Sequence, residues 1–267
     1  PAPCSKSSVG PAPVSWMCHL CTGGSTHSYR DLIPILANQF HVVALDLPGQ
    51  GFTQLGARHR CGLDDMAQDI ARLCEQEGWH PRVVIGHSAG GAVSFRLAEA
   101  DLSPRGQPPL VIGINAALEE FKGLAGVMFP VMAKALAAVP FTAALFAGAS
   151  GNPERIKALI GSTGSEIDAD GLDLYRRLVG DRTHVDGTLL MMAQWNLNPI
   201  LARLENHPSE MHFIVGTQDR TVRPDVSRKA AARLRNATVH ELAGAGHLAH
   251  EERPRETAEL ICNIALG

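Results

Sequence analysis

One serine lies where the sequence favours a nucleophile. Ser88 is the centre of the Gly-x-Ser-x-Gly segment at residues 86–90, between an apolar run and a segment with helical spacing. A turn from strand to helix at this point is so sharp that glycines must flank the serine, and it lifts the hydroxyl out of the sheet edge. The backbone N–H of Ala89 would then begin a helix and could stabilise an oxyanion. The alternative is a serine in an ordinary strand-to-helix loop.

The candidate general base is a histidine near the end of the chain. A serine hydroxyl is a weak nucleophile at neutral pH and needs a base beside it. His247 follows the glycine-containing segment 244–246, which allows a close approach to the serine. His250 is the nearest competitor, but we expect it on a following turn or helix start. A buried structural histidine is the alternative interpretation of His247.

An aspartate can orient this histidine. Asp219 follows the predicted strand 211–215 by a three-residue turn, so we expect it at the same sheet edge as the serine. A buried carboxylate there would hold the imidazole in one tautomer and one orientation. A loop carboxylate or a helix cap ahead of Pro224 is the alternative.

The elements that must position these residues alternate along the chain. Strands are predicted at 41–45, 82–85, 110–114, 211–215 and 238–242, and helices at 63–78, 89–100, 224–234 and 254–266. Strands separated by helices predict a mostly parallel, doubly wound sheet in an α/β fold. The sequence after residue 114 predicts mostly helices, with helical segments at 123–147, 153–160, 170–179 and 185–195. We expect a core formed by 1–114 and 207–267 and a helical lid insertion at 115–206 of the same domain.

Four segments together resemble the α/β-hydrolase superfamily over nearly the whole chain from about residue 22. They are the serine turn at 86–90, the Asp-Leu-Pro-Gly-Gln-Gly turn at 46–51, and the segments at 216–219 and 246–247. The chain order Ser, Asp, His is also that of the superfamily. The insertion, at 113–117, 123–130, 161–165, 173–175 and 191–195, is similar to that of the magnesium-chelatase accessory hydrolases of bacteriochlorophyll synthesis. This resemblance implies a role near magnesium insertion into protoporphyrin, with chelatase subunits as partners.

The start of the chain departs from the superfamily. Its members usually end the third strand in His-Gly, and the following residue gives the second oxyanion N–H. Here His19 is followed by Leu20 and Cys21, and the pattern resumes only at 22–25. Residues 1–18 also lack the alternation expected of an opening hairpin. We interpret residues 1–21 as a frame or sequence error rather than a truly divergent start, and take Thr22 as the second oxyanion donor.

Several side chains are candidates for a substrate pocket. Met128, Met132, Met192 and Trp195 in the insertion would suit a flat apolar ligand such as a tetrapyrrole, because Met adapts its shape and Trp offers a stacking face. His87, beside the nucleophile, is a further candidate. Packing of the insertion against the core explains the apolar side chains at least as well.

Composition and missing motifs argue against other functions. A net charge of −3 leaves no basic footprint for nucleic acid. The sequence contains neither an H-E-x-x-H motif nor a Walker A motif, so we expect no metal, cofactor or ATP site. The six scattered cysteines favour reduced thiols in a cytoplasmic protein, and the pair Cys18 and Cys21 is interpreted as incidental. The first residues show no basic segment followed by a long apolar run, so we expect no export signal. The apolar stretch 123–147 is broken by a lysine and two prolines, so we predict no membrane span.

Two function classes follow from these observations. The first is a serine hydrolase of a small acyl substrate or a tetrapyrrole ester. Carbon–carbon hydrolysis and cofactor-free perhydrolysis would use the same three residues. The second is a non-catalytic accessory protein that binds a porphyrin or the chelatase. The shape of the pocket decides between such chemistries, and fold resemblance alone does not reveal it.

Overall fold

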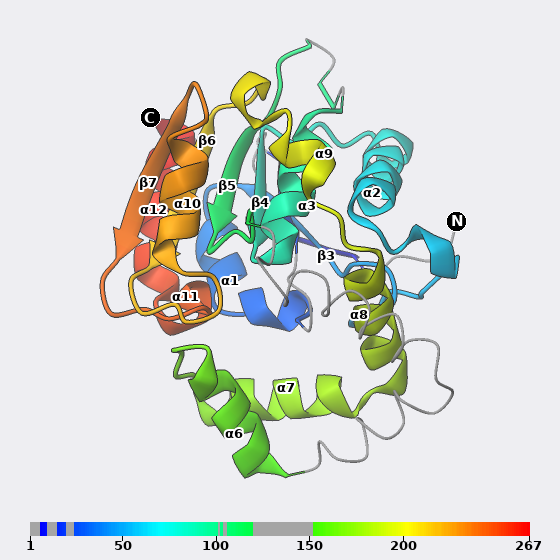
Figure 1. The fold of residues 1–267 in the computed structure, drawn as a ribbon, viewed down its shortest axis with the longest axis vertical. Coiled ribbons are helices and arrows are strands. Elements are labelled where there is room, and N and C mark those ends of the chain that lie inside the picture. The colour runs from blue at the N-terminus through cyan, green and yellow to red at the C-terminus, as the bar shows by residue number, and fades with distance from the viewer. Residues whose placement is uncertain (1–5, 10–14, 20–23, 101, 104–105, 120–151) are drawn as a thin grey trace.

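The computed structural model describes residues 6–9, 15–19, 24–100, 102–103, 106–119 and 152–267, and its centre is a seven-stranded sheet (Figure 1). The strands are β1 (Lys6–Val9), β2 (Ser15–His19), β3 (His41–Leu45), β4 (Val83–His87), β5 (Leu110–Ile114), β6 (Met211–Gly216) and β7 (Ala237–Leu242). Their spatial order is β1-β3-β2-β4-β5-β6-β7. β1 pairs with β3 antiparallel, and the other pairs are parallel. The predicted, mostly parallel sheet is confirmed.

Helices cover both faces of this sheet (Figure 1). The helices of the core are α1 (Leu32–Leu36), α2 (Leu63–Glu77), α3 (Ala89–Ala98), α10 (Pro224–Ala231), α11 (Ala249–Glu252) and α12 (Pro254–Leu266). Successive strand residues point to opposite faces. Accordingly, Val43 and Val84 pack in one cluster with residues of α2, α3 and α10, whereas Val42 and Ile85 pack in another with residues of α1 and α12. Burial on both faces explains why β3, β4 and β5 are mostly continuous apolar runs.

The described part of the insertion is helical and begins beyond the carboxyl ends of the strands. Its helices are α6 (Pro153–Ser162), α7 (Ala169–Gly180), α8 (Arg182–Gln194) and α9 (Asn198–Leu201). In Figure 1 the arrowheads of β5 and β7 point toward the side where α6 and α7 lie. Asn152, Asp168 and Asp181 cap α6, α7 and α8 by accepting backbone N–H groups of the first turn. The predicted helices near these ranges are confirmed, and the predicted pair at 123–147 lies outside the described residues.

The opening strands differ from the sequence analysis. The sequence pattern predicts no strands in residues 1–18. This prediction is wrong, because β1 pairs with β3, and β2 pairs with both β3 and β4. The segments of β1 (KSSV) and β2 (SWMCH) form neither a continuous apolar run nor a strict alternation, so their pattern does not predict a strand. β2 ends at His19, whose register partner is Gly86 in the strand that precedes the serine turn. The interpretation of residues 1–21 as an error stays a prediction.

Candidate active site

Ser88 occupies the single position between the end of β4 and the start of α3. Its φ of 53° and ψ of −120° lie in a region that residues other than glycine rarely adopt. The turn is held because the Ser88 N–H donates to the Ile114 carbonyl (3.0 Å) and the Ser88 carbonyl accepts from Ala117 N–H (2.9 Å). A Cβ at Gly86 would meet the backbone of Gly90. The half-buried serine therefore sits on a tight, strained turn at the carboxyl edge of the sheet.

The N-terminus of α3 provides one candidate oxyanion donor. Ala89 is the first residue of α3, so its N–H is one of the helix-start donors that lack an intrahelical partner. The partial positive charge of a helix start favours an anion at this point. Thr22, the second expected donor, lies outside the described residues.

Asp219 and His247 form a buried hydrogen-bonded pair. Nδ1 of His247 lies 2.8 Å from Oδ2 of Asp219, and the Asp219 side chain is fully buried. The other carboxylate oxygen, Oδ1, accepts the N–H groups of Thr221 (2.8 Å) and Val222 (2.9 Å). Because a carboxylate only accepts, Nδ1 carries the proton in this bond, and Nε2 keeps the lone pair that a general base needs.

Asn115 joins the segments that carry these residues, and the sequence analysis missed it. Its Nδ2 donates to the carbonyls of Gly246 (3.0 Å) and His247 (2.8 Å), and its Oδ1 accepts Gly216 N–H (2.8 Å). Asn115 has a φ of 46°, which asparagine tolerates better than most residues. The preceding residue accepts the Ser88 N–H, so Asn115 links the turns after β4, β5 and β6 with the base segment. A polar residue directly after the apolar β5 run is the signal that could have revealed it.

A group of histidine rings packs behind the base. The centroid of the His87 ring lies 4.7 Å from that of His247 and 4.5 Å from that of His250. Burial lowers the pKa of His87 well below its usual value and lowers that of His250 to about 3, so both rings are neutral at neutral pH. Nε2 of His87 lies 2.7 Å from the His247 carbonyl.

The surroundings of two histidines considered in the sequence analysis, His87 and His250, follow from these contacts. His87 is 1% exposed and its ring supports the base segment, and its expected place among the pocket residues stays a prediction. His250 lies on α11, as expected, and its Nε2 lies 2.8 Å from Oγ of Ser28.

The turn after β3 connects the loop at Thr26 to the insertion. The carboxylate of Asp46 accepts the N–H groups of Thr26 (2.6 Å) and Phe52 (2.9 Å), and burial raises the pKa of this carboxyl. Gly51 N–H donates to Nδ1 of His184 on α8 (3.1 Å). Asp46 thus fixes the loop that follows residues 20–23, and His184 ties α8 to the same turn.

The structure describes two of the four apolar candidates for the substrate pocket. Trp195, directly after α8, is partly buried and packs against the larger core cluster, as the packing interpretation expects. Met192 on α8 is also partly buried. Met128 and Met132 lie outside the described residues.

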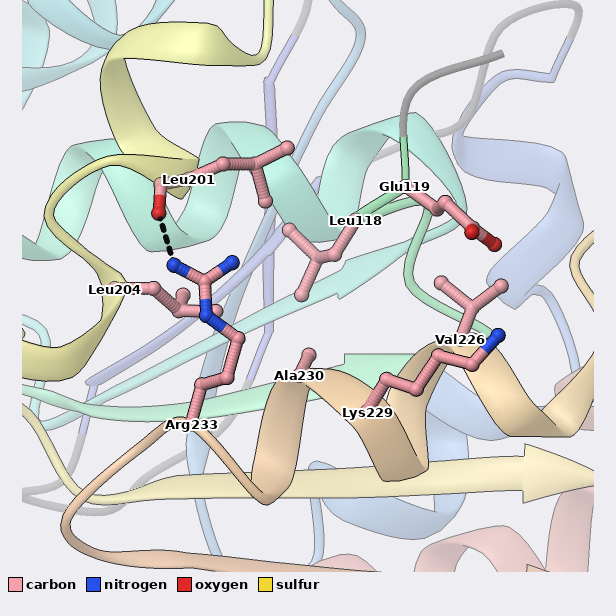
Figure 2. A pocket seen from close by; sticks show the side chains of 8 residues that line it. All are labelled: Leu118, Glu119, Leu201, Leu204, Val226, Lys229, Ala230 and Arg233. Carbon is pink, nitrogen blue, oxygen red and sulfur yellow. Dashed lines mark hydrogen bonds between the residues drawn. The ribbon is translucent and has the colours of Figure 1, made fainter. Parts of the chain in front are cut away.

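The groove in Figure 2 is separate from the candidate residues. It has a volume of about 310 Å³ and lies between α10, the α9–β6 segment and the residues that follow β5. Its lining residues are Leu118, Glu119, Leu201, Leu204, Val226, Lys229, Ala230 and Arg233. Arg233 crosses one end and donates to the Leu201 carbonyl (2.7 Å). The groove therefore contains none of the expected site residues.

Among the residues that the structure describes, no three His, Cys, Asp or Glu side chains are grouped so that they could hold a metal ion. None of the helices within the described ranges combines the length and the apolar character that a membrane crossing requires.

Comparison with known proteins places the chain in a family. The model of the alpha/beta hydrolase family matches residues 17–260. The magnesium-chelatase 30 kDa subunit of Rhodobacter capsulatus is 46% identical over 245 residues, which cover 91% of this chain and 84% of that protein. The epoxide hydrolase EphH of Mycobacterium tuberculosis is 29% identical over 207 residues, with coverages of 74% and 92%. The structure of an alpha/beta hydrolase fold protein from Burkholderia ambifaria aligns with a TM-score of 0.77 and 20% identity, over 97% of this chain and 93% of that one. The chain therefore belongs to the alpha/beta hydrolase family.

Proposed function

We propose that this protein is a serine-nucleophile hydrolase of an ester or a related acyl substrate. The observation that carries the proposal is Ser88 on its strained turn, at the same sheet edge as the bonded pair Asp219 and His247. Backbone strain of this kind costs about 1–3 kcal/mol and persists where the surrounding structure enforces it, which is common at active sites.

The residues suggest a two-step acyl transfer. Ser88 Oγ attacks the substrate carbonyl while Nε2 of His247 takes the hydroxyl proton, and the Ala89 N–H stabilises the oxyanion. Asp219 stabilises the resulting imidazolium, which then gives its proton to the leaving group. Water attacks the acyl-enzyme, His247 takes a proton from the water, and Ser88 departs with that proton. The acid is released and the enzyme returns to its starting state.

A serine at position 88 favours acyl chemistry over epoxide hydrolysis, the reaction in the name of one relative. If the serine oxygen opened an epoxide, the product would be an ether, which offers no carbonyl carbon where water could release it. An acyl-enzyme has that carbonyl, so turnover is complete. Carbon–carbon hydrolysis and cofactor-free perhydrolysis with the same three residues are the alternatives within this proposal.

We also propose that the reaction takes place in the cytoplasm, in association with magnesium chelatase. The support is the 46% identity to the magnesium-chelatase 30 kDa subunit over most of both chains. The partners would be chelatase subunits, and the substrate an acyl compound or a tetrapyrrole ester. The same relative supports a second candidate, a non-catalytic protein that binds a porphyrin or the chelatase. The strained turn at Ser88 favours catalysis, because binding alone gives no reason to keep it.

Labelling with a fluorescent fluorophosphonate tests the nucleophile. We expect covalent labelling of the wild-type protein at the Ser88 peptide, read by mass spectrometry, and no labelling of Ser88→Ala. Ser162→Ala changes an exposed serine and should label like the wild type. A folded wild-type protein that is not labelled would contradict the proposal. Normal pigment formation in cells that carry Ser88→Ala would instead favour the non-catalytic candidate.

A further inference from the structure

A turn of the insertion lies against both segments that carry the acid and the base. The turn comprises Thr163, Gly164 and Ser165, between α6 and α7, and is called the 163–165 turn below. Ser165 is 1% exposed, although the turn is more than fifty residues from Asp219 and more than eighty from His247 in the chain. A buried contact over such a separation is formed only in the folded protein.

The first half of the turn contacts the segment of Asp219. The Thr163 carbonyl accepts the N–H of Arg220 (3.0 Å), the residue directly after the aspartate. Gly164 has a φ of 88°, and a Cβ there would meet the carbonyl of Gln218, the residue directly before the aspartate. The backbone of the turn therefore touches both neighbours of Asp219, and only a glycine fits at its centre.

The second half of the turn contacts the segment of His247. Oγ of Ser165 accepts the N–H of Leu248 (2.8 Å), the residue directly after the histidine. A Cβ at Gly246, directly before the histidine, would meet the Gly164 carbonyl and would lie 2.6 Å from Ser165 N. The same turn therefore touches both neighbours of His247.

Packing holds the turn in this place. Leu248 lies in one buried cluster with Ile156 and Ile160 of α6 and Tyr175 of α7. The Tyr175 hydroxyl donates to Oε1 of Glu251 on α11 (2.7 Å). The Glu251 side chain is fully buried, so α7 is fixed to the helix that follows the base.

We propose that the 163–165 turn positions the Asp219–His247 pair, with Ser165 as the positioning residue. The turn sets the separation of the two segments from the side of the insertion, while Asn115 holds them from the side of the sheet. Ser165 contacts no reacting atom and acts through the Leu248 N–H. This inference rests on the proposed roles of Asp219 and His247. It makes the insertion part of the catalytic framework as well as a cover for it.

The test compares Ser165→Ala with Ser162→Ala, an exposed serine three residues earlier. The readout is the second-order rate of fluorophosphonate labelling at Ser88 between pH 5 and pH 9. We expect Ser165→Ala to label at least about tenfold more slowly, because misplacement of a catalytic group by about 1 Å can cost about 100-fold. The pH of half-maximal labelling should shift as well. Ser162→Ala should match the wild type in both respects.

A second variant covers the case in which Ser165→Ala does not fold. Ser165→Cys keeps the size of the side chain but replaces the oxygen by a weak acceptor, so labelling should fall while circular dichroism stays unchanged. Wild-type rates and pH profiles in both variants would overturn the inference. So would a loss of labelling that only accompanies unfolding. An unlabelled wild type would instead refute the proposed function, which keeps the two failures apart.

Discussion

Asn115 uses both ends of its amide to join three chain segments, and this gives a prediction at the scale of one residue. Asn115→Ala would leave Gly216 N–H and the Gly246 carbonyl without this partner, and the His247 carbonyl would keep only its contact with the His87 ring. Each such buried group costs about 1–3 kcal/mol, and alanine tolerates the left-handed backbone poorly. We expect the free energy of unfolding, measured in urea, to fall by about 3 kcal/mol, with slower labelling of Ser88.

The exposed Asn38 provides the control for this prediction. Its Nδ2 donates to the carbonyls of Pro34 and Ile35, each at 3.2 Å, near the protein surface. Asn38→Ala should therefore change the free energy of unfolding by no more than about 0.5 kcal/mol. Equal losses in the two variants would show that Asn115 has no special role.

Single residues differ in how far the sequence reveals them. Ser88, Asp219 and His247 are predictable as candidates, because each follows a predicted strand in a short, glycine-containing context. The importance of Asn115 and Ser165 is not predictable from the sequence, because their hydrogen-bond partners lie 83 to 132 positions away in the chain and the bonds form only on folding. The local sequence shows that Asn115 directly follows an apolar run, but it does not show which segments its amide joins.

The same difference appears at the scale of elements. The helix from Leu63 has a full apolar period and ends before Gly78, whose φ of 65° suits a helix C-terminus, so both of its ends are predictable. Long helices and fully buried strands share this property. The helices α1, α9 and α11 contain four or five residues, too few to show a helical period. Tertiary contacts define them, as they define β1 and β2.

Two glycines on helices of the insertion give a prediction at this scale. A Cβ at Gly187 on α8 would meet the Gly49 carbonyl and would lie 2.8 Å from Gly49 Cα, whereas a Cβ at Gly161 on α6 would have nothing within 4 Å. Glycine inside a helix is less favourable than alanine by about 0.5–1 kcal/mol. Gly161→Ala should therefore raise the free energy of unfolding in urea by about that amount.

Gly187→Ala should act in the opposite direction. The new methyl group must push α8 away from the 46–51 turn, and such overpacking typically costs about 1–3 kcal/mol. The free energy of unfolding should fall by that amount, and the contact between Gly51 N–H and His184 should loosen, which faster amide exchange at Gly51 would reveal. A stabilising effect of both substitutions would mean that α8 does not pack closely on the turn.

At the scale of the whole molecule, the fold encloses histidines that it keeps neutral. Burial lowers the pKa of His27 to about 4 and that of His250 to about 3. Burial also lowers the pKa values of His87 and His207. The folded state therefore binds fewer protons than the unfolded chain when the solution becomes mildly acidic.

This difference predicts how stability depends on pH. Above pH 6.5, the ordinary histidine pKa, both states are neutral and the full stability is present. As the pH falls, histidines of the unfolded chain bind protons that the buried histidines of the folded state do not bind. Stability is therefore lost progressively until the pH reaches the pKa of the histidine in the folded state. For one such histidine the loss is about 1.4 kcal/mol per pH unit, or about 2 kcal/mol between pH 6.5 and pH 5.

His250 is the residue with which to measure this effect, because its pKa is lowered to about 3 and its ring is buried. His250→Gln removes the titration, so the free energy of unfolding in urea should fall less steeply with acidification than that of the wild type. The two curves should converge by about 2 kcal/mol between pH 6.5 and pH 5. Carboxyl groups whose pKa burial raises, such as Asp46 and Glu251, act in the opposite direction in both proteins, so the difference isolates the histidine. Parallel curves would mean that His250 takes up its proton over the same pH range in the folded state as in the unfolded chain, so that the ring cluster behind His247 becomes charged on acidification.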